Sequence, residues 1–140
     1  ITFGNVANDH SLCEKFPIHN LGFIQDELLM RAVYSASDVI AVPSRNESFG
    51  LVASEAMACS RPVICFDSCG LKDIVDHKVN GYLAKSFNTS DFAMGILWLM
   101  ENENSKLLSE AARNKVQRLF SEKIVAQQYL DFYKNAIEAI

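Results

Sequence analysis

One stretch decides the fold of this chain: VIAVPSRNESFGLVASEAMA, residues 39–58. Its first four residues form a continuous apolar run, which is typical of a parallel strand that is covered on both faces. The residues from Phe49 to Cys59 predict a helix, with Gly50 in its first turn. A strand end followed directly by a helix start is the place where open α/β sheets bind ligands.

Two glutamates, Glu47 and Glu55, flank the predicted helix start. The free backbone N–H groups of a helix start bind anions such as phosphate. Carboxylates only accept hydrogen bonds, so they suit the hydroxyl groups of sugars. A nucleoside diphosphate sugar contains all of these parts, with a diphosphate between two hydroxyl-bearing rings. Gly50 fits this interpretation because a side chain there would obstruct the close approach of a phosphate.

A plainer interpretation of the same residues stays open. Ser44 and Glu47 have the spacing of a capping box, in which Glu47 only helps to start the helix. Glu55, about two turns farther along, would then be a solvated position on the helix surface.

Strands and helices alternate along the rest of the chain. The apolar runs predict strands at Ile1–Gly4, Ile18–Phe23, Val39–Val42, Pro62–Phe66 and Gly81–Ala84. The periodic segments predict a helix after Asp26, a helix or turn at Gly70–Val75, and helices at Phe49–Cys59, Thr89–Met100, Ser105–Phe120 and Ser121–Ala139. This order predicts an α/β fold with a doubly wound parallel sheet and C-terminal helices.

The last predicted helix carries a broad apolar face that includes Tyr129, Phe132 and Tyr133. We expect this face to pack on the same domain. The alternative is that part of the helix docks on a neighbouring domain.

Composition excludes several classes of protein. The 140 residues carry a net charge of −4, which argues against a general nucleic-acid binder. No apolar run approaches the length of a membrane span. The four cysteines form no C-x-x-C pair and the three histidines are scattered, so we expect reduced thiols and no metal site.

Other catalytic patterns fit less well. The two glutamates suit a glycoside hydrolase pair less than a phosphorylated donor, because they lie beside an anion-binding helix start. The chain contains no G-x-G-x-x-G, Walker A or G-x-S-x-G sequence.

The segment from Leu21 to Lys85 resembles the C-terminal, donor-binding domain of retaining GT-B glycosyltransferases of the group 1, or family 4, type. The resemblance is carried by Ala36-Ser37-Asp38-Val39, Pro43-Ser44, Glu47-Ser48-Phe49-Gly50-Leu51, Glu55-Ala56-Met57-Ala58-Cys59, Arg61-Pro62-Val63 and Asn80-Gly81-Tyr82-Leu83. The chain departs from the family pattern at Ser60, Cys69 and Asp73, where two glycines and a glutamate are usual.

The resemblance implies a role for each residue at the site. Glu47 would be the catalytic residue and would contact the donor sugar, while Glu55 would bind the ribose. Phe23 and Ile24 would lie beside the nucleobase. The donor, a UDP- or GDP-linked sugar, would be bound by Glu47, Ser48, Phe49, Gly50, Leu51 and Glu55. No metal or other cofactor is expected.

The resemblance also implies a biological setting. A hexosyl group would pass with retention of configuration to a glycan or lipid-linked acceptor, in the synthesis of a cell-surface polysaccharide. We expect residues 1–140 to be the C-terminal domain of a cytoplasmic enzyme, with a place at the inner membrane face left open. The N-terminal acceptor domain would be missing, so the chain alone should be inactive. The alternatives are a GT-B nucleotide-sugar epimerase or phosphorylase, and a stand-alone α/β interaction or sensory domain.

Overall fold

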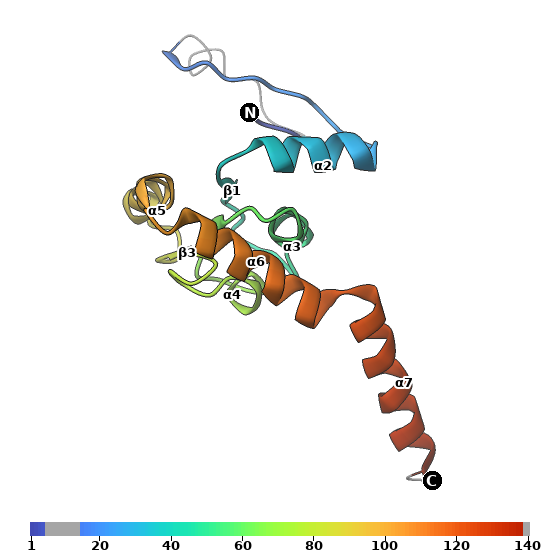
Figure 1. Ribbon diagram of the computed structural model, residues 1–140. Helices are drawn as coiled ribbons and strands as arrows, with labels where there is room; N and C mark the ends of the chain where they lie inside the picture. Colours follow the sequence, from blue (N-terminus) through green and yellow to red (C-terminus); the bar gives the residue numbers. More distant parts are fainter. Residues whose placement is uncertain (5–14, 139–140) are drawn as a thin grey trace. The chain divides into compact units, whose positions relative to one another are not determined.

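The computed structural model describes residues 1–4 and 15–138, and the chain divides into two units, Ile1–Val33 and Tyr34–Ile140 (Figure 1). In the first unit, two extended segments run parallel around a single bridge between Thr2 and Asn20. The Thr2 N–H donates to the His19 carbonyl at 2.8 Å, and the Leu21 N–H donates to the Thr2 carbonyl at 2.9 Å.

The predicted strands Ile1–Gly4 and Ile18–Phe23 are therefore wrong in extent, since among their residues only Thr2 and Asn20 form a bridge. Gly4 and Gly22 adopt φ values of +87° and +65°, which lie outside the extended region. The Asn20 side chain accepts the Gly22 N–H at 3.0 Å. Such local side-chain bonds compete with the backbone ladder of a strand.

Helix α2 (Glu27–Ala36) begins in the first unit and ends in the second. The helix begins directly after Asp26, as predicted. The Asp26 carboxylate accepts the Leu29 N–H at 2.7 Å. This is the bond by which an N-cap side chain satisfies a free helix N–H group.

The second unit is built on a parallel sheet of three strands in the order β1-β2-β3. These strands are β1 (Ile40–Val42), β2 (Val63–Phe66) and β3 (Gly81–Ala84). Ile40 pairs with Val63, and Val63 pairs with Gly81. Every residue of β2 is buried, as expected for a central strand with helices on both faces.

The described helices that follow β1 are α3 (Leu51–Ala58), α4 (Leu71–Ile74), α5 (Thr89–Glu101), α6 (Ser105–Phe120) and α7 (Glu122–Glu138). Helix α5 packs on β2 and β3, where Ile64 and Tyr82 form a buried cluster with Leu99. Besides α5, helices α3 and α4 also contact β2. Several helices can contact one strand because alternate residues of a strand face opposite sides of the sheet. The α/β fold with a parallel sheet and C-terminal helices is thus confirmed.

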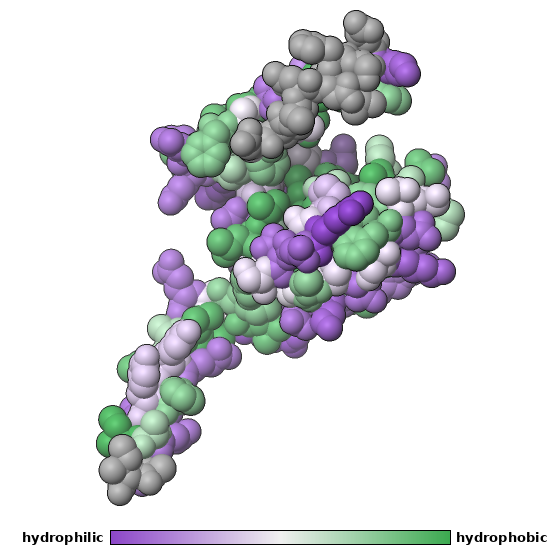
Figure 2. All heavy atoms as spheres, turned by 180° about the vertical axis from the view of Figure 1, so that it is seen from behind, coloured by the Kyte–Doolittle hydropathy of each residue, from purple (hydrophilic) through white to green (hydrophobic). Residues whose placement is uncertain are grey.

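Helix α7 corrects one expectation. None of its described residues is buried, and the apolar side chains of Tyr129, Phe132, Tyr133 and Ile137 are exposed. Figure 1 shows α7 running on from α6, and Figure 2 shows apolar side chains among polar ones along it. The expected packing of this face on the same domain is wrong, because within the unit α7 contacts mainly the adjoining helix α6.

Candidate functional site

The strand-to-helix corner after β1 is formed by residues 43–50. Helix α3 begins at Leu51, two residues later than predicted, with Gly50 as its N-cap residue. Gly50 has φ 99° and ψ 54°, a left-handed conformation that ends the loop and that residues with side chains rarely adopt. Phe49 therefore lies in the loop, where its ring meets that of Phe120 at a centroid distance of 5.2 Å.

No side chain caps the start of α3. The capping box predicted for Ser44 and Glu47 is therefore absent, because neither residue stands at the helix start. The first turn of a helix has N–H groups without partners inside the helix. Those of α3 lie at the carboxyl end of β1, directly after Gly50.

A second corner, after β2, packs directly against the first. The Gly70 N–H donates to the Glu47 carbonyl at 3.1 Å. A Cβ atom at Gly70 would overlap the Ser48 carbonyl oxygen, and a Cβ atom at Gly50 would come within 2.8 Å of Leu71 Cδ2. Glycine at both positions is thus required by packing between the corners. The Gly70 N–H is not free to bind a ligand, because it is used by the Glu47 carbonyl.

The side chains of the two predicted glutamates differ in exposure. Glu47 is half-buried, and Glu55 is exposed on the second turn of α3. The Tyr34 hydroxyl, which comes from α2, donates to Glu55 Oε2 at 2.9 Å. Burial, and then this hydrogen bond to Glu55, raise the pKa of Tyr34 above its ordinary value.

Sequence reasoning missed Tyr34. The available signal was its position four residues after Met30, which is the spacing of one helix face. A buried tyrosine also needs a hydrogen-bond partner. The partner lies 21 residues away in sequence, so spacing alone does not identify it.

Two arginines near the corner, Arg45 and Arg61, make different contacts. The guanidinium of Arg45 lies 5.5 Å from the ring centre of Phe87, which follows β3 at the same edge of the sheet. Arg61 precedes β2, and its Nη2 donates to the Ser35 carbonyl at 2.7 Å. Arg61 therefore serves the last turn of α2 rather than the corner with Glu47.

The predicted nucleobase residues, Phe23 and Ile24, belong to the first unit. Phe23 is exposed and Ile24 is half-buried. Their role stays a prediction.

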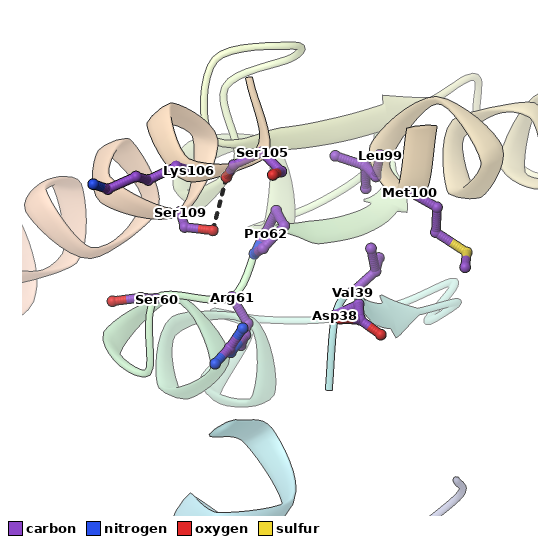
Figure 3. Close-up of a pocket in the computed structure, with 10 residues that line it drawn as sticks. All are labelled: Asp38, Val39, Ser60, Arg61, Pro62, Leu99, Met100, Ser105, Lys106 and Ser109. Atoms are coloured by element: carbon purple, nitrogen blue, oxygen red, sulfur yellow. Dashed lines mark hydrogen bonds between the residues drawn. The ribbon is translucent and has the colours of Figure 1, made fainter. Parts of the chain in front are cut away.

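A hollow lies at the other edge of the sheet. It has a volume of about 520 Å³ and is lined by residues before β1 and β2, such as Val39 and Pro62, and by Ser109 of α6 (Figure 3). The charged ends of Arg61 and Lys106 point away from its centre in Figure 3. This hollow lies away from the corner that carries Glu47. The corner after β1 is the better candidate, because ligands of parallel sheets bind at the carboxyl ends of strands.

The described part of the chain offers neither a metal site nor a membrane span. No group of three His, Cys, Asp or Glu residues there is arranged to hold a metal ion. None of the described helices is long and apolar enough to cross a membrane.

Burial raises the pKa of the Cys65 thiol to about 12. Cys59 and Cys69 are free thiols, and Cys13 lies outside the described residues.

Comparison of the sequence with known families gives one clear match. The family model described as glycosyl transferases group 1 matches residues 12–118. A D-inositol 3-phosphate glycosyltransferase of Saccharomonospora viridis is 44% identical over 108 residues, which cover 76% of this chain and 25% of that protein. The chain spans about a quarter of the length of the curated relatives that it matches.

Solved structures show the same arrangement. Sucrose-phosphate synthase from Thermosynechococcus elongatus has a TM-score of 0.81 at 31% identity, covering 94% of this chain and 34% of that one. HepE of Anabaena, solved with UDP and glucose, has a TM-score of 0.79 at 22% identity, covering 95% of this chain and 39% of that one. The second likeness shows the fold alone.

Proposed function

The chain belongs to the glycosyl transferases of group 1, and on this basis we propose that it binds the nucleotide-sugar donor of a retaining hexosyltransferase. The hexosyl group passes to a glycan or lipid-linked acceptor in the synthesis of a cell-surface polysaccharide. The donor is linked to UDP or GDP. UDP is the first candidate, because the HepE structure was solved with that nucleotide.

The observation that carries this proposal is the start of helix α3. It lies at the carboxyl end of a parallel strand, it has no side-chain cap, and Gly50 precedes it. Open N–H groups at a helix start favour an anion by hydrogen bonds and by the helix dipole. The donor's diphosphate is the anion that this arrangement suits.

Each glutamate has a separate role in the proposal. Glu47 accepts hydrogen bonds from the hydroxyls of the transferred sugar, beside the diphosphate. Glu55, one turn into the helix, accepts hydrogen bonds from the ribose. Ser48, Phe49 and Leu51 offer backbone N–H groups between them. The bond between Gly70 and the Glu47 carbonyl supports this arrangement, because it holds the loop backbone in place.

The remaining chemistry comes from other parts of the enzyme in this proposal. A leaving diphosphate needs stabilisation as its bond to the sugar breaks, and helix N–H groups supply only part of it. We place the other cations and the acceptor site in a separate N-terminal domain, and we assign no role to a metal ion. The 140-residue chain should therefore bind the donor weakly and transfer sugar hardly at all.

The direct test is a nucleotide titration of the 140-residue chain followed by NMR. UDP, GDP and their glucose and mannose conjugates are added with EDTA present, to exclude a metal requirement. We expect dissociation constants in the range of about 0.1–1 mM, corresponding to roughly 4–5.5 kcal/mol of binding free energy. Glu55→Ala should weaken binding about tenfold, the order expected for a lost hydrogen bond to a carboxylate.

The matched control is Glu110→Ala, which removes an exposed glutamate from α6. It should leave nucleotide binding unchanged. If none of the nucleotides binds, the donor site is refuted. Absence of binding together with a tight homodimer through α7 would instead support the interaction-domain alternative.

A further inference from the structure

Tyr34 and Glu55 form a contact between two helices at the edge of the candidate site. The Tyr34 side chain is 1% exposed, and its hydroxyl donates to Glu55 Oε2 at 2.9 Å. Glu55 itself is exposed. One oxygen of this carboxylate is thus bound to a buried and immobile group, while the side chain as a whole faces solvent.

The buried end of this contact is well anchored. Ser35, the next residue of α2, accepts a hydrogen bond from Arg61 Nη2 at 2.7 Å. The Ser37 N–H donates to the Tyr34 carbonyl at 3.1 Å. The last turn of α2 is therefore held directly after the tyrosine, which limits the positions that the phenol can take.

The phenol is also a constant donor. Burial raises the pKa of Tyr34 above its ordinary value, and the bond to Glu55 raises it further. The hydroxyl therefore stays protonated at the near-neutral pH of a binding titration. A glutamate has three rotatable bonds and loses considerable side-chain freedom when it is fixed. A carboxylate that is already fixed pays less of this cost when a ligand binds.

We infer that Tyr34 is a positioning residue for the ribose of the donor: it holds Glu55 Oε2 and leaves the other oxygen directed to the ribose hydroxyls. This inference rests on the proposed donor site. It assigns a function to a buried residue that need not touch the ligand. The ligand class is a ribonucleoside diphosphate. The property that depends on Tyr34 is the preference of the site for a nucleotide with ribose over one whose sugar lacks the 2′ and 3′ hydroxyls.

The test compares UDP and GDP with their 2′,3′-dideoxy analogues, by NMR titration of the 140-residue chain. The wild-type chain should prefer the ribonucleotide by about tenfold. Tyr34→Phe should lower that preference to about threefold or less, while the affinity for the dideoxy analogue stays unchanged. Glu55→Ala should abolish the preference. Tyr34→Phe added to Glu55→Ala should cost nothing more, because Tyr34 acts through Glu55.

Tyr82→Phe is a matched control for the lost hydroxyl. The Tyr82 hydroxyl donates to Asp91 Oδ1 at 3.0 Å, so the control also breaks a tyrosine–carboxylate bond. It should leave the ribose preference unchanged. Thermal unfolding of each variant shows which of them are folded at the titration temperature.

A second variant covers the case in which Tyr34→Phe does not fold. Glu55→Asp keeps a carboxylate on an exposed position but shortens it away from the phenol, and it should lose most of the ribose preference. The inference is overturned if Tyr34→Phe or Glu55→Asp keeps the wild-type preference for ribose. It is also overturned if Tyr34→Phe lowers the affinity for the ribonucleotide and for its dideoxy analogue equally. A wild-type chain that binds neither UDP nor GDP refutes the donor site itself, and the two failures are therefore distinguishable.

Discussion

Helices α3 and α5 begin in different ways, although each follows the carboxyl end of a strand of the same sheet. At α5, the Asn88 side chain accepts the Asp91 N–H at 3.0 Å. The Asp91 carboxylate accepts the Lys85 N–H at 2.7 Å and the Tyr82 hydroxyl at 3.0 Å. At α3 there is no side-chain cap and no acidic residue in the first turn.

The difference separates a helix start that is capped by side chains from one that has no side-chain cap. The protein's own side chains satisfy the start of α5, and capping of this kind stabilises a helix by about 1 kcal/mol. The start of α3 forgoes that gain and has a glycine in a left-handed conformation. Groups that are costly to leave unpaired are commonly left so where a ligand pairs them.

The largest expected effect comes from a side chain at Gly50. Gly50→Ala puts a Cβ atom 2.8 Å from Leu71 Cδ2 at a φ of +99°. Conformational strain and overpacking together should cost on the order of 3 kcal/mol of unfolding free energy. Urea denaturation measures this. Leu51→Ala, at the exposed neighbouring position, should change stability by less than about 0.5 kcal/mol, and equal losses in both variants would argue against the packing of the two corners.

Asn88 is the corresponding test at α5. Asn88→Ala removes the side-chain cap seen at 3.0 Å from the Asp91 N–H. It should lower the unfolding free energy by about 1 kcal/mol, and Asn88→Gly by only a few tenths. Nucleotide binding should not change in either variant. A loss of binding would mean that the two helix starts are not functionally separate.

Asp91 adds a pH dependence to the same helix. The hydrogen bond from the Lys85 N–H, the largest cause, lowers the pKa of Asp91 below its ordinary 3.8. The carboxylate thus contributes stability above the unfolded-state pKa, and this contribution is lost as the pH falls through the lower folded-state value. Asp91→Asn should cost about 0.5–1 kcal/mol at pH 7.

The check is urea denaturation of both proteins at pH 7 and again below the ordinary pKa of 3.8. The difference in unfolding free energy between wild type and Asp91→Asn should shrink at the lower pH. A difference that stays constant would show that the carboxylate charge has no part in holding the start of α5.

The smallest effect is expected at Ser44, which would be the N-cap residue of a capping box. No such box forms, since α3 starts at Leu51 with Gly50 as its N-cap residue. Ser44→Ala should therefore change the unfolding free energy by less than about 0.5 kcal/mol. A loss of about 1 kcal/mol in urea denaturation would show that Ser44 does cap the helix in solution.

The parts of the fold that could be predicted from the sequence are those set by local pattern. The apolar runs at Val63–Phe66 and Gly81–Ala84 became strands, and the helix start at Asp26 followed from its capping chemistry. The extent of pairing between the segments near Thr2 and Asn20 could not be predicted from their apolar residues. Their glycine conformations and the Asn20 side-chain bond depend on the folded backbone.

For the candidate site, the sequence predicted the family, while the roles of the site residues stay predictions. The spacing of Glu47 and Glu55 indicated a ligand corner, and the resemblance supplied the family that the comparisons confirm. The contact of Gly70 with Glu47 and that of Tyr34 with Glu55 join segments more than 20 residues apart. Contacts of that range follow from packing and leave no periodic signal in the sequence.

The cysteines near the second corner allow a chemical probe to be placed beside it. Burial raises the pKa of Cys65 to about 12, so this thiol stays protonated at pH 8, and alkylating reagents react with the thiolate. Cys69 is exposed and directly precedes Gly70. In a chain with Cys13→Ser and Cys59→Ser, a maleimide fluorophore would therefore label one position, next to the loop that carries Glu47.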